Sequence, residues 1–412
     1  MAALSYDPLR ELRPANRERI LAELREGAPT YWSSVHAAWV LTRYADVSAI
    51  LRHQDALALE LASFLQLVSE RGKLDLSSLI EFCSSVSFLT HRPRHEAVRH
   101  VLVQALGRIW RMNLTELVEK RADQLLALGE RDGIIDLAGG YGRPLASFVI
   151  GSFLGVPEVD LPELRAVARD LTAVFERVVA RKVLIKLNKC AAALINYFVR
   201  LIVSKRQDSG DDGTSTIVKL ADKHLECSDR ELAGYCTFFF LAAEETTSAA
   251  IPGAALILLR HPSLRARLVS DASLIPHAVG EMLRLVSAVQ YVVRKLRVDV
   301  NLEGQVIPAG EPIVLMLGAA NRDPAAFPNP DEVVLDRTGP EPLAFATGPY
   351  RCIGAQLATF EVELAMRKLL ERPRIQLSSD FPVWTDRSNV APLLRLPACF
   401  VSEAHDLGRT SA

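Results

Sequence analysis

Apolar residues recur at the three-to-four-residue spacing of amphipathic helices along most of the chain. The spacing predicts helices over residues 15–24, 94–106, 114–128, 145–154, 184–203, 231–259 and 275–285. Short β-like segments occur at 31–34, 38–42 and 293–317, where Gly304, Pro308 and Gly310 mark turns. We therefore expect a mainly helical fold with a small amount of sheet.

The chain shows no internal repeat, low-complexity tract or long linker, and only residues 208–214 have the composition of a flexible surface loop. A single domain spanning 1–412 is the simplest interpretation. From Pro308 to Gly354 the sequence is rich in Pro, Gly and Asp and has little periodicity. A long irregular stretch in a helical protein usually serves a site, and we expect this one to do so.

Composition allows a large core, because 49% of the 412 residues are hydrophobic and 24% are charged. The formal net charge of -1 gives no global reason to expect nucleic-acid binding. The first eight residues have neither a basic start nor an apolar run, so we expect a cytoplasmic protein without a membrane anchor. The six cysteines contain no CxxC pair, which disfavours a disulfide framework and a zinc site.

One cysteine, Cys352, lies where a Gly- and Pro-containing loop runs into an apolar-periodic helix. A helix N-terminus lowers the pKa of a thiol and favours the thiolate, which is the form that binds a metal. Gly348 and Gly354 allow the backbone to approach a flat cofactor, and the Phe345 ring can pack beside the sulfur. Without such a context, an inert buried thiol is the ordinary interpretation.

A second unusual segment, residues 238–247, lies inside the helix predicted at 231–259. Two adjacent acids in an apolar helix are costly, so Glu244 and Glu245 must find solvent, a partner or a proton, and they suggest a wet cavity beside the core. Thr246 lies one turn after Ala242, whose carbonyl its hydroxyl can bind, which would open a small groove. A solvated acidic patch on an amphipathic helix is the alternative.

The segment around Cys352 resembles the heme-binding loop of the cytochrome P450 superfamily, in which Phe, two Gly, a basic residue, the ligand Cys and a further Gly have fixed spacing. The positions that fit are Phe345, Gly348, Cys352 and Gly354. Ala346 stands where the family usually has Gly, and Tyr350 where it usually has His or Arg. The resemblance implies that Cys352 is the axial ligand of the iron of heme b, iron protoporphyrin IX.

The sequence at 242–247 is similar to the family's oxygen-activating motif, apart from Ala243 in place of Gly. The resemblance implies that Glu245 and Thr246 are catalytic and deliver protons during dioxygen activation. It also places Ala242 and Ala243 beside the heme.

Further segments resemble the family's heme-anchoring elements, including near-verbatim stretches at 304–310 and 319–331. By this resemblance Arg294 binds a heme propionate, for which its planar fork is suited. His95 and Arg99, one helical turn apart, have the same implied task, and Tyr350 occupies a position that usually shares it. His91 and His95 also form an i, i+4 pair typical of zinc sites, but no third ligand accompanies them.

Glu281 and Arg284 lie three residues apart on one helical face, which alone would indicate a surface ion pair. In the family such a pair joins an Arg from the loop before the cysteine, here Arg337. The implied role of these three residues is structural.

The resemblance covers nearly the whole chain and implies a triangular helical prism with a small β lobe and a buried heme between the helix of Thr246 and the helix after Cys352. Thiolate ligation favours O–O cleavage, so the implied function is monooxygenation of a hydrophobic small molecule, plausible in secondary metabolism. Oxidative coupling, desaturation or peroxide-driven oxidation is an alternative outcome. A non-catalytic heme-binding or sensor protein is an alternative of another class.

No flavin or iron–sulfur segment accompanies this sequence, so NAD(P)H-dependent partners must supply electrons, either a ferredoxin with its reductase or a flavodoxin. An acidic partner would meet a basic face, for which the candidates are Arg99, His100, Arg108 and Arg351. Ordinary solvated charge is the alternative for these residues. We expect a monomer.

The family recognises substrates through variable segments, here 56–89, 167–187, 289–292 and 389–394, which are mostly apolar. The residues that we expect to line the substrate pocket are Leu241, Gln290, Tyr291 and Leu393. Glu60, Gln290 and Tyr291 are candidates for polar specificity.

Overall fold

The computed structural model describes residues 9, 16–34, 36–86, 90, 93–108, 114–176, 180–378, 382–385, 387–390 and 392–401. The helices are α1 (Arg17–Gly27), α2 (Tyr44–Arg52), α3 (Leu61–Gly72), α4 (Ser77–Ser85), α5 (Arg94–Leu106), α6 (Leu114–Asp132), α7 (Arg143–Leu154), α8 (Leu161–Leu171), α9 (Arg181–Gln207), α10 (Gly213–His224), α11 (Asp229–Arg260), α12 (Pro262–Ser270), α13 (Ile275–Val286), α14 (Leu317–Ala320) and α15 (Ala355–Leu370). The strands are β1 (Thr30–Ser33), β2 (Ala38–Leu41), β3 (Ala56–Ala58), β4 (Ile134–Asp136), β5 (Val292–Leu296), β6 (Val300–Leu302), β7 (Gln305–Ile307), β8 (Pro312–Leu315), β9 (Ile375–Leu377), β10 (Val383–Trp384), β11 (Leu393–Arg395) and β12 (Pro397–Phe400).

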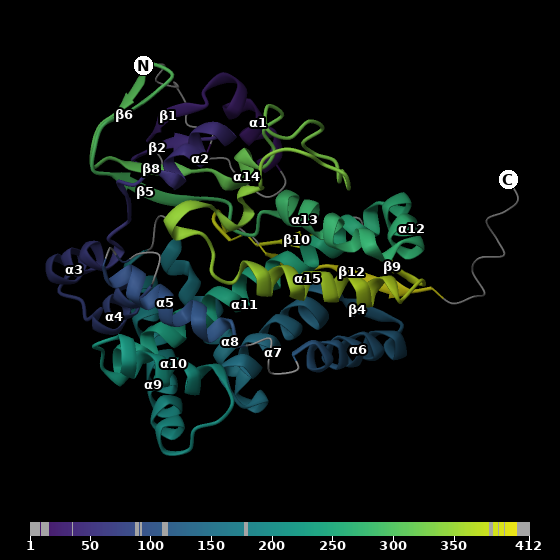
Figure 1. The fold of residues 1–412 in the computed structure, drawn as a ribbon, viewed down its shortest axis with the longest axis horizontal. Coiled ribbons are helices and arrows are strands. Elements are labelled where there is room, and N and C mark those ends of the chain that lie inside the picture. The colour runs from purple at the N-terminus through teal and green to yellow at the C-terminus, as the bar shows by residue number, and fades with distance from the viewer. Residues whose placement is uncertain are drawn as a thin grey trace, which may run out of the picture.

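The long helix α11 runs through the middle of the molecule (Figure 1). It begins with a capping box, in which the Ser228 hydroxyl accepts from the Glu231 backbone N–H and the Glu231 carboxylate accepts from the Ser228 N–H. Helices α4, α7, α9 and α15 pack around it. Its apolar residues are buried on almost every side, which explains why the sequence lacks a polar stripe there.

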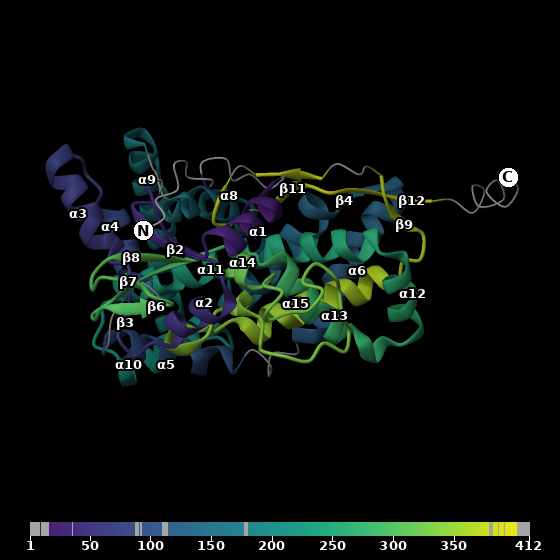
Figure 2. The same ribbon diagram turned by 90° about the horizontal axis from the view of Figure 1, so that it is seen from above.

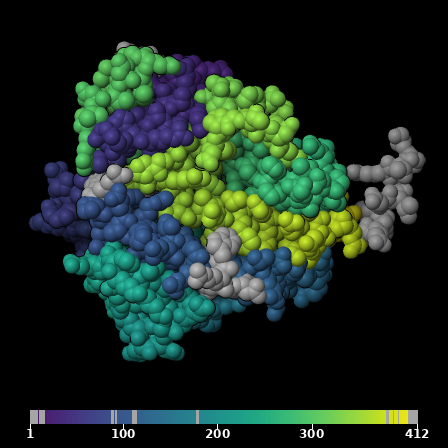
Figure 3. Space-filling model, viewed as in Figure 1, coloured from purple at the N-terminus to yellow at the C-terminus, as the bar shows by residue number. Residues whose placement is uncertain are grey.

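The main sheet forms a separate lobe, with strand order β1-β2-β8-β5-β3. The hairpin of β1 and β2 is antiparallel, whereas β2 pairs with β8 in parallel register from Trp39↔Ile313 to Leu41↔Leu315. In the space-filling view the N-terminal residues therefore lie against residues near 300, at one end of the molecule (Figure 3). A small core that includes Val47 and Ile307 fills this lobe. The predicted minor sheet is confirmed.

The stretch between β8 and α15 has little regular structure beyond α14 and the short 3-10 turns η8 (Leu343–Phe345) and η9 (Gly348–Tyr350). It leads from the sheet lobe across α13 to the start of α15, and Figure 2 shows this side of the molecule from a second direction. The irregular stretch predicted from Pro308 to Gly354 is confirmed, apart from the strand β8 and these short turns.

Helix α9 is long and apolar enough to cross a membrane, with a mean hydropathy of 1.2 over its best window. Its apolar side, however, packs on α4, α8 and α11, as does that of a core helix in a globular protein. Length and composition are therefore weak grounds for a membrane span in this helix.

Candidate active site

One turn of α11 is left uncovered. From Leu232 to Leu256 every residue of this helix is buried except Ala242, Ala243 and Thr246. These three positions share one face of the helix, since residues separated by three or four positions are neighbours on its surface. The packing around α11 thus leaves the surface beside a single turn partly exposed, and we call the space beside it the hollow.

The Thr246 hydroxyl donates to the Ala242 carbonyl oxygen at 2.8 Å, as the sequence predicted. Such a bond competes with the helix's own hydrogen bonding and loosens the turn locally. Because Ala242 and Ala243 carry only methyl groups, the helix itself places no large side chain beside this turn. The threonine hydroxyl therefore lies at the edge of open space.

Cys352 lies on the loop that leads into α15, which packs against α11. Its backbone N–H donates to the Phe345 carbonyl at 2.9 Å, and its side chain is exposed. Protein nevertheless surrounds the sulfur, so desolvation raises the pKa of the thiol, while the Gly354 N–H, Arg99 and Arg351 lower it. The expectation that the helix N-terminus lowers the pKa of this thiol is therefore wrong, because desolvation dominates. A bound metal cation deprotonates a coordinating thiol by itself.

The backbone before Cys352 takes two conformations that favour glycine. Gly348 has φ +74, and a Cβ there would collide with the Leu51 carbonyl oxygen on α2. The position is thus constrained by contact with α2, in addition to any approach of a cofactor. Ala346 has φ 53 and ψ -170, a region that is costly for a residue with a Cβ. The family's usual Gly would adopt this conformation without that cost.

Tyr350 lies between two of the predicted anion-binding residues. Its ring centroid is 4.5 Å from that of His95 and 4.7 Å from the guanidinium carbon of Arg294. Arg294 is only 3% exposed, and its Nε has no hydrogen-bond partner among the described residues. Burial lowers the pKa of Arg294 to about 10, with Tyr350 opposing the shift. A buried guanidinium with an unused donor is suited to an anionic group such as a propionate.

Arg99, one turn after His95 on α5, contacts the cysteine loop. Its Nη1 donates to the Arg351 carbonyl at 2.7 Å, and its charge is one of those that lower the pKa of Cys352. The structure therefore brings His95 together with Arg294, and it brings Arg99 to the backbone of the cysteine loop. Binding of a heme propionate by His95 and Arg99 together stays a prediction.

These observations fit a heme. The exposed sulfur offers an axial ligand, the uncovered turn of α11 leaves room for a flat group, and the cluster around Tyr350 offers an anchor for its carboxylates. Among the described residues no group of three or more His, Cys, Asp and Glu side chains could hold a metal ion by itself. His91, the other member of the possible zinc pair, lies outside the described residues.

The two acids of α11 are both buried but have different partners. Glu245 accepts an ion-paired hydrogen bond of 2.7 Å from Arg387, which also donates to Thr172 and to the Arg169 carbonyl. Glu244 is 3.2 Å from the Ser147 hydroxyl on α7. The solvated acidic patch considered from the sequence is excluded by this burial.

Burial raises the pKa of both carboxyl groups. Burial and the charge of Glu245 raise the pKa of Glu244 to about 8, although a hydrogen bond from Ser147 and the charges of two arginines lower it by less. For Glu245 the guanidinium of Arg387 opposes the rise. The two acids thus differ in their partners: the Arg387 cation stabilises a charge on Glu245, whereas Glu244 is beside the Ser147 hydroxyl.

Sequence reasoning missed Arg387 and Ser147. They are 142 and 97 residues away from their carboxylate partners along the chain. Neither belongs to a local motif, although Arg387 lies just before one of the predicted substrate segments. Only the fold brings them to α11.

Glu281, Arg284 and Arg337 come together as predicted. Arg284 forms two bonds to the Glu281 carboxylate, at 2.7 and 2.9 Å, and the Arg337 Nε donates to it at 2.8 Å. Arg284 is fully buried and also donates to backbone carbonyls of the irregular stretch, at Asn321, Pro330 and Glu332. The ion pair is therefore buried instead of lying on the surface.

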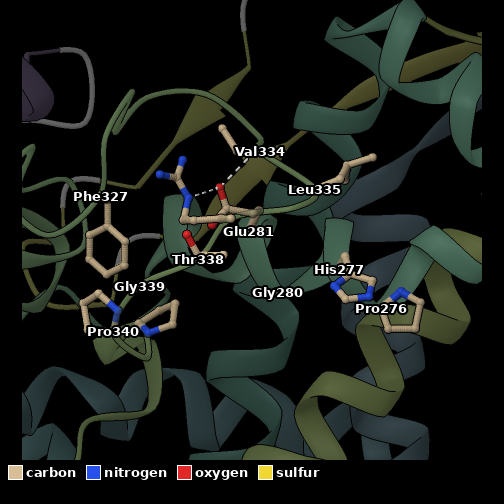
Figure 4. A pocket seen from close by; sticks show the side chains of 12 residues that line it. Pro276, His277, Gly280, Glu281, Phe327, Val334, Leu335, Thr338, Gly339 and Pro340 are labelled. Carbon is tan, nitrogen blue, oxygen red and sulfur yellow. Dashed lines mark hydrogen bonds and ion pairs between the residues drawn. The ribbon is translucent and has the colours of Figure 1, made fainter.

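A pocket of about 240 Å³ opens beside this network (Figure 4). His277, Gly280 and Glu281 line it on the α13 side, and Val334 and Thr338 lie on the facing loop. It lies away from both Cys352 and Thr246, since neither residue lines it. We assign no ligand to it.

The residues predicted to line the substrate pocket are buried, at 0–4% exposure, and two of them are engaged within the protein. The Gln290 amide donates to the carbonyls of Val286 and Ser287. The Tyr291 hydroxyl is 3.2 Å from the Ser388 hydroxyl. Contact of Leu241, Gln290, Tyr291 and Leu393 with a substrate stays a prediction.

Comparisons with known proteins agree with the fold. Residues 168–394 match the family model described as cytochrome P450. The biotin biosynthesis cytochrome P450 of Bacillus subtilis is 30% identical over 379 residues, which cover 90% of this chain and 89% of the relative. The cytochrome P450 monooxygenase PikC of Streptomyces venezuelae is 34% identical over 314 residues, 74% of this chain and 73% of the relative.

Among solved structures, the complex of P450BioI with an acyl carrier protein ligated to hexadec-9Z-enoic acid is similar at a TM-score of 0.86. The identity is 28%, and the match covers 94% of this chain and 99% of that one. CalO2 is similar at a TM-score of 0.85 and 26% identity, covering 92% and 95% of the two chains.

The fold and the site therefore define a heme-thiolate oxygenase, with a helical body, a small sheet lobe and a cysteine loop beside a long central helix. The chain belongs to the cytochrome P450 family. It is an oxidoreductase of the monooxygenase class, and membership in the family implies heme iron as cofactor and dioxygen as co-substrate.

Proposed function

We propose that this enzyme hydroxylates an apolar small molecule of secondary metabolism, with Cys352 as the iron ligand and with Glu245 and Thr246 as the proton-delivering residues. The observation that carries the proposal is the single uncovered turn of α11, Ala242 to Thr246, on a helix that packs against the helix behind Cys352. In this arrangement the ligand and the hydroxyl belong to neighbouring elements.

Arg294 and His95, on either side of the Tyr350 ring, would hold the heme carboxylates, and Arg99 would steady the cysteine loop through the Arg351 carbonyl. When bound, heme with a thiolate ligand supplies an oxidant able to attack unactivated C–H bonds. The ion network of Glu281, Arg284 and Arg337 has a structural role, because it fixes the irregular stretch that carries Cys352.

Thr246 and Glu245 provide the proton path on the other side of the hollow. The Thr246 hydroxyl rests on the Ala242 carbonyl and can turn toward the open space by rotation about χ1. Glu245 is adjacent in sequence, and its carboxylate is held by Arg387 at 2.7 Å. A threonine hydroxyl backed by a buried carboxylate is a suitable device for moving protons one at a time.

Electrons come, in this proposal, from separate NAD(P)H-dependent proteins, either a ferredoxin with its reductase or a flavodoxin. Arg351 is exposed and lies next to the iron ligand, and its side chain makes a long 3.7 Å contact with Glu341. Arg108 is also exposed, whereas Arg99 is half-buried and bonded to the loop. Of the basic residues considered, Arg351 and Arg108 are thus the freest to meet an acidic partner.

The names of relatives support a biosynthetic substrate. They include mycinamicin IV hydroxylase/epoxidase of Micromonospora griseorubida and pentalenic acid synthase of Streptomyces avermitilis.

We propose that the 412 residues form one heme domain that acts as a monomer in the cytoplasm. Coupling or desaturation of the same substrate class is the second outcome that this site would support.

The test uses Thr246→Ala, with Thr115→Ala on the exposed side of α6 as the matched control. Substrate candidates are first selected by the shift that they induce in the heme absorption band. We expect Thr246→Ala to divert electrons from product to hydrogen peroxide, while the control behaves as wild type. Equal coupling in all three proteins, or faster turnover with peroxide than with dioxygen in the wild type, would contradict the proposal.

A further inference from the structure

Glu244 is a buried acid that the proposed proton path does not use. It is 2% exposed and lies where α11 meets α7 and α8. The charged groups that face the acid pair are Arg143 on α7, Arg165 and Arg169 on α8, and Arg387 in the C-terminal segment. Glu245 is the one negative charge that acts on Glu244 from its own helix.

The neighbour of Glu244 on α7 limits its protonation state. The Ser147 hydroxyl donates to the Arg143 carbonyl one turn earlier, at 2.8 Å. A hydroxyl has one proton to donate but can accept two further bonds. The same hydroxyl is the donor at the 3.2 Å contact with Glu244, and its single proton cannot serve both oxygens fully, so it stabilises a charge on Glu244 only weakly. Among the described residues no cationic side chain forms an ion pair with Glu244, and the adjacent Glu245 carries a negative charge, so burial favours the protonated form of Glu244.

Glu245 has the opposite surroundings. Its contact with the Arg387 guanidinium at 2.7 Å is an ion pair, in which the carboxylate is the acceptor. Arg387 is itself fixed by Thr172 and by the Arg169 carbonyl, so its fork cannot turn away freely. One helix turn thus holds a carboxylic acid and a carboxylate at adjacent positions.

We propose that Glu244 is the proton reserve of this site: it holds a proton beside the ionised Glu245 and supplies it to Glu245 during turnover. The inference rests on the proposed role of Glu245 and Thr246. Glu244 acts through Glu245 and does not touch the reacting atoms, so it is a positioning residue for the proton.

The transfer breaks the O–H bond of Glu244 and forms one on Glu245, leaving Glu244 as a carboxylate. Solvent then returns a proton to Glu244. Arg169 is exposed and the Arg387 side chain is 22% exposed, so these arginines that face the acid pair are open to the solvent from which the proton comes. The raised pKa of Glu244, about 8, agrees with a proton that is bound at neutral pH but still exchangeable.

The protonation state is tested by infrared spectroscopy of the heme-loaded enzyme with isotopically labelled glutamate. We expect the carbonyl stretch of a protonated carboxyl group in the wild type, shifted by the label and absent in Glu244→Gln. Glutamine keeps the size, the neutral charge and an acceptor for Ser147, so this variant should fold. If Glu244→Gln leaves the spectrum unchanged, Glu244 carries no proton and the proposal fails.

Turnover provides the second measurement. Glu244→Gln should lower dioxygen-dependent product formation by about tenfold and raise the solvent hydrogen isotope effect, while turnover with added peroxide stays at the wild-type level. The wild-type rate should fall as the pH rises through about 8, where the reserve loses its proton, and this fall should be absent in the variant. Glu244→Asp, which keeps an exchangeable proton, should recover part of the rate.

The matched control is Glu163→Gln, an exposed carboxylate on α8, which should match the wild type in every assay. Thr246→Ala separates the two proposals. If it impairs coupling while Glu244→Gln does not, only the proton reserve is wrong. If neither variant has an effect, the proposed proton path fails as well.

Discussion

Two buried glutamates of this protein, Glu281 and Glu244, differ in how many donors surround them. Glu281 receives bonds from Arg284, Arg337 and the Val334 backbone N–H. Burial favours its neutral form, but these bonds outweigh burial and lower its pKa. Among the described residues only the Ser147 hydroxyl forms a hydrogen bond with the Glu244 side chain, and the pKa of Glu244 rises to about 8.

The comparison shows that burial alone does not decide what an acid does. A carboxylate with two guanidiniums and a backbone donor is a permanent charge, and it fixes three stretches of chain. A carboxyl group with one hydroxyl neighbour keeps its proton and can release it. The first arrangement suits structure and the second suits chemistry.

The largest effect is expected for Glu281→Gln. The change leaves the fully buried Arg284 without its counter-charge and should destabilise the protein by about 3–5 kcal/mol, since removing one partner of a buried pair exposes the cost of the other. Urea unfolding of the heme-loaded protein measures this. Glu18→Gln breaks the exposed pair with Arg322 and should cost about 0–1 kcal/mol. Similar losses of stability in the two variants would show that the buried ion pair contributes no more than the surface pair.

The pH dependence of stability should have opposite signs at the two acids. Glu281, with a lowered pKa, adds stability above its unfolded value of 4.5 that is lost as the pH falls through the folded value. Glu244, with a raised pKa, adds stability that is full below 4.5 and is lost as the pH rises toward about 8.

Unfolding free energies of Glu281→Gln and Glu244→Gln, measured from acid to mildly alkaline pH, check this. Each variant should lack the pH-dependent contribution of the replaced acid to the unfolding free energy, which is a few kcal/mol at most. If the contributions of Glu281 and Glu244 to stability change with pH in the same direction, the hydrogen-bond donors around each acid do not determine the difference between their pKa values.

Glu245→Gln tests the catalytic member of the acid pair. It removes the carboxylate partner of Arg387 and should reduce dioxygen-dependent turnover by about 100-fold, within the usual range for a proton-transferring residue. Steady-state product formation at saturating substrate measures the loss. Arg395→Gln, on the exposed part of β11, is the control. A variant that turns over at the wild-type rate would show that Glu245, like Glu281, is structural.

The smallest effect is expected at Ala346. Replacing it with Gly relieves a left-handed conformation and should stabilise the heme-loaded protein by about 1 kcal/mol. Thermal unfolding measures the gain, and Ala344→Gly, two residues earlier in the 3-10 turn η8, should instead be neutral or destabilising. A loss of stability in Ala346→Gly would show that the loop is not strained there.

Periodicity predicted the long elements well, because their apolar faces are wide. The helix expected at 94–106 is α5 itself, and the core helix expected at 231–259 is α11 within two residues at each end. The shorter helices α2, α3, α4, α8, α10, α12 and α14 were not predicted. A helix of about ten residues shows only two or three apolar repeats, and tertiary packing decides whether it forms.

The site residues also fall into two groups, those that the sequence predicted and those that it did not. Motifs revealed Cys352, Thr246 and Glu281 because each lies in a short stretch whose residues act together. The sequence could not reveal the pairing of Arg387 with Glu245, since the two meet only after the chain has folded. It also misjudged the pKa of Cys352, because desolvation depends on the surrounding atoms and not on the neighbouring residues in sequence.

The account depends most directly on the bond between the Cys352 sulfur and the heme iron. Reduced, heme-loaded enzyme is mixed with carbon monoxide, and its absorption is compared with that of Cys352→Ser and of Cys399→Ser, a thiol of the sheet strand β12. We predict the red-shifted band of thiolate ligation in the wild type and in Cys399→Ser, and its loss in Cys352→Ser. A wild-type enzyme without this band, or a Cys352→Ser variant that retains it, would contradict the account.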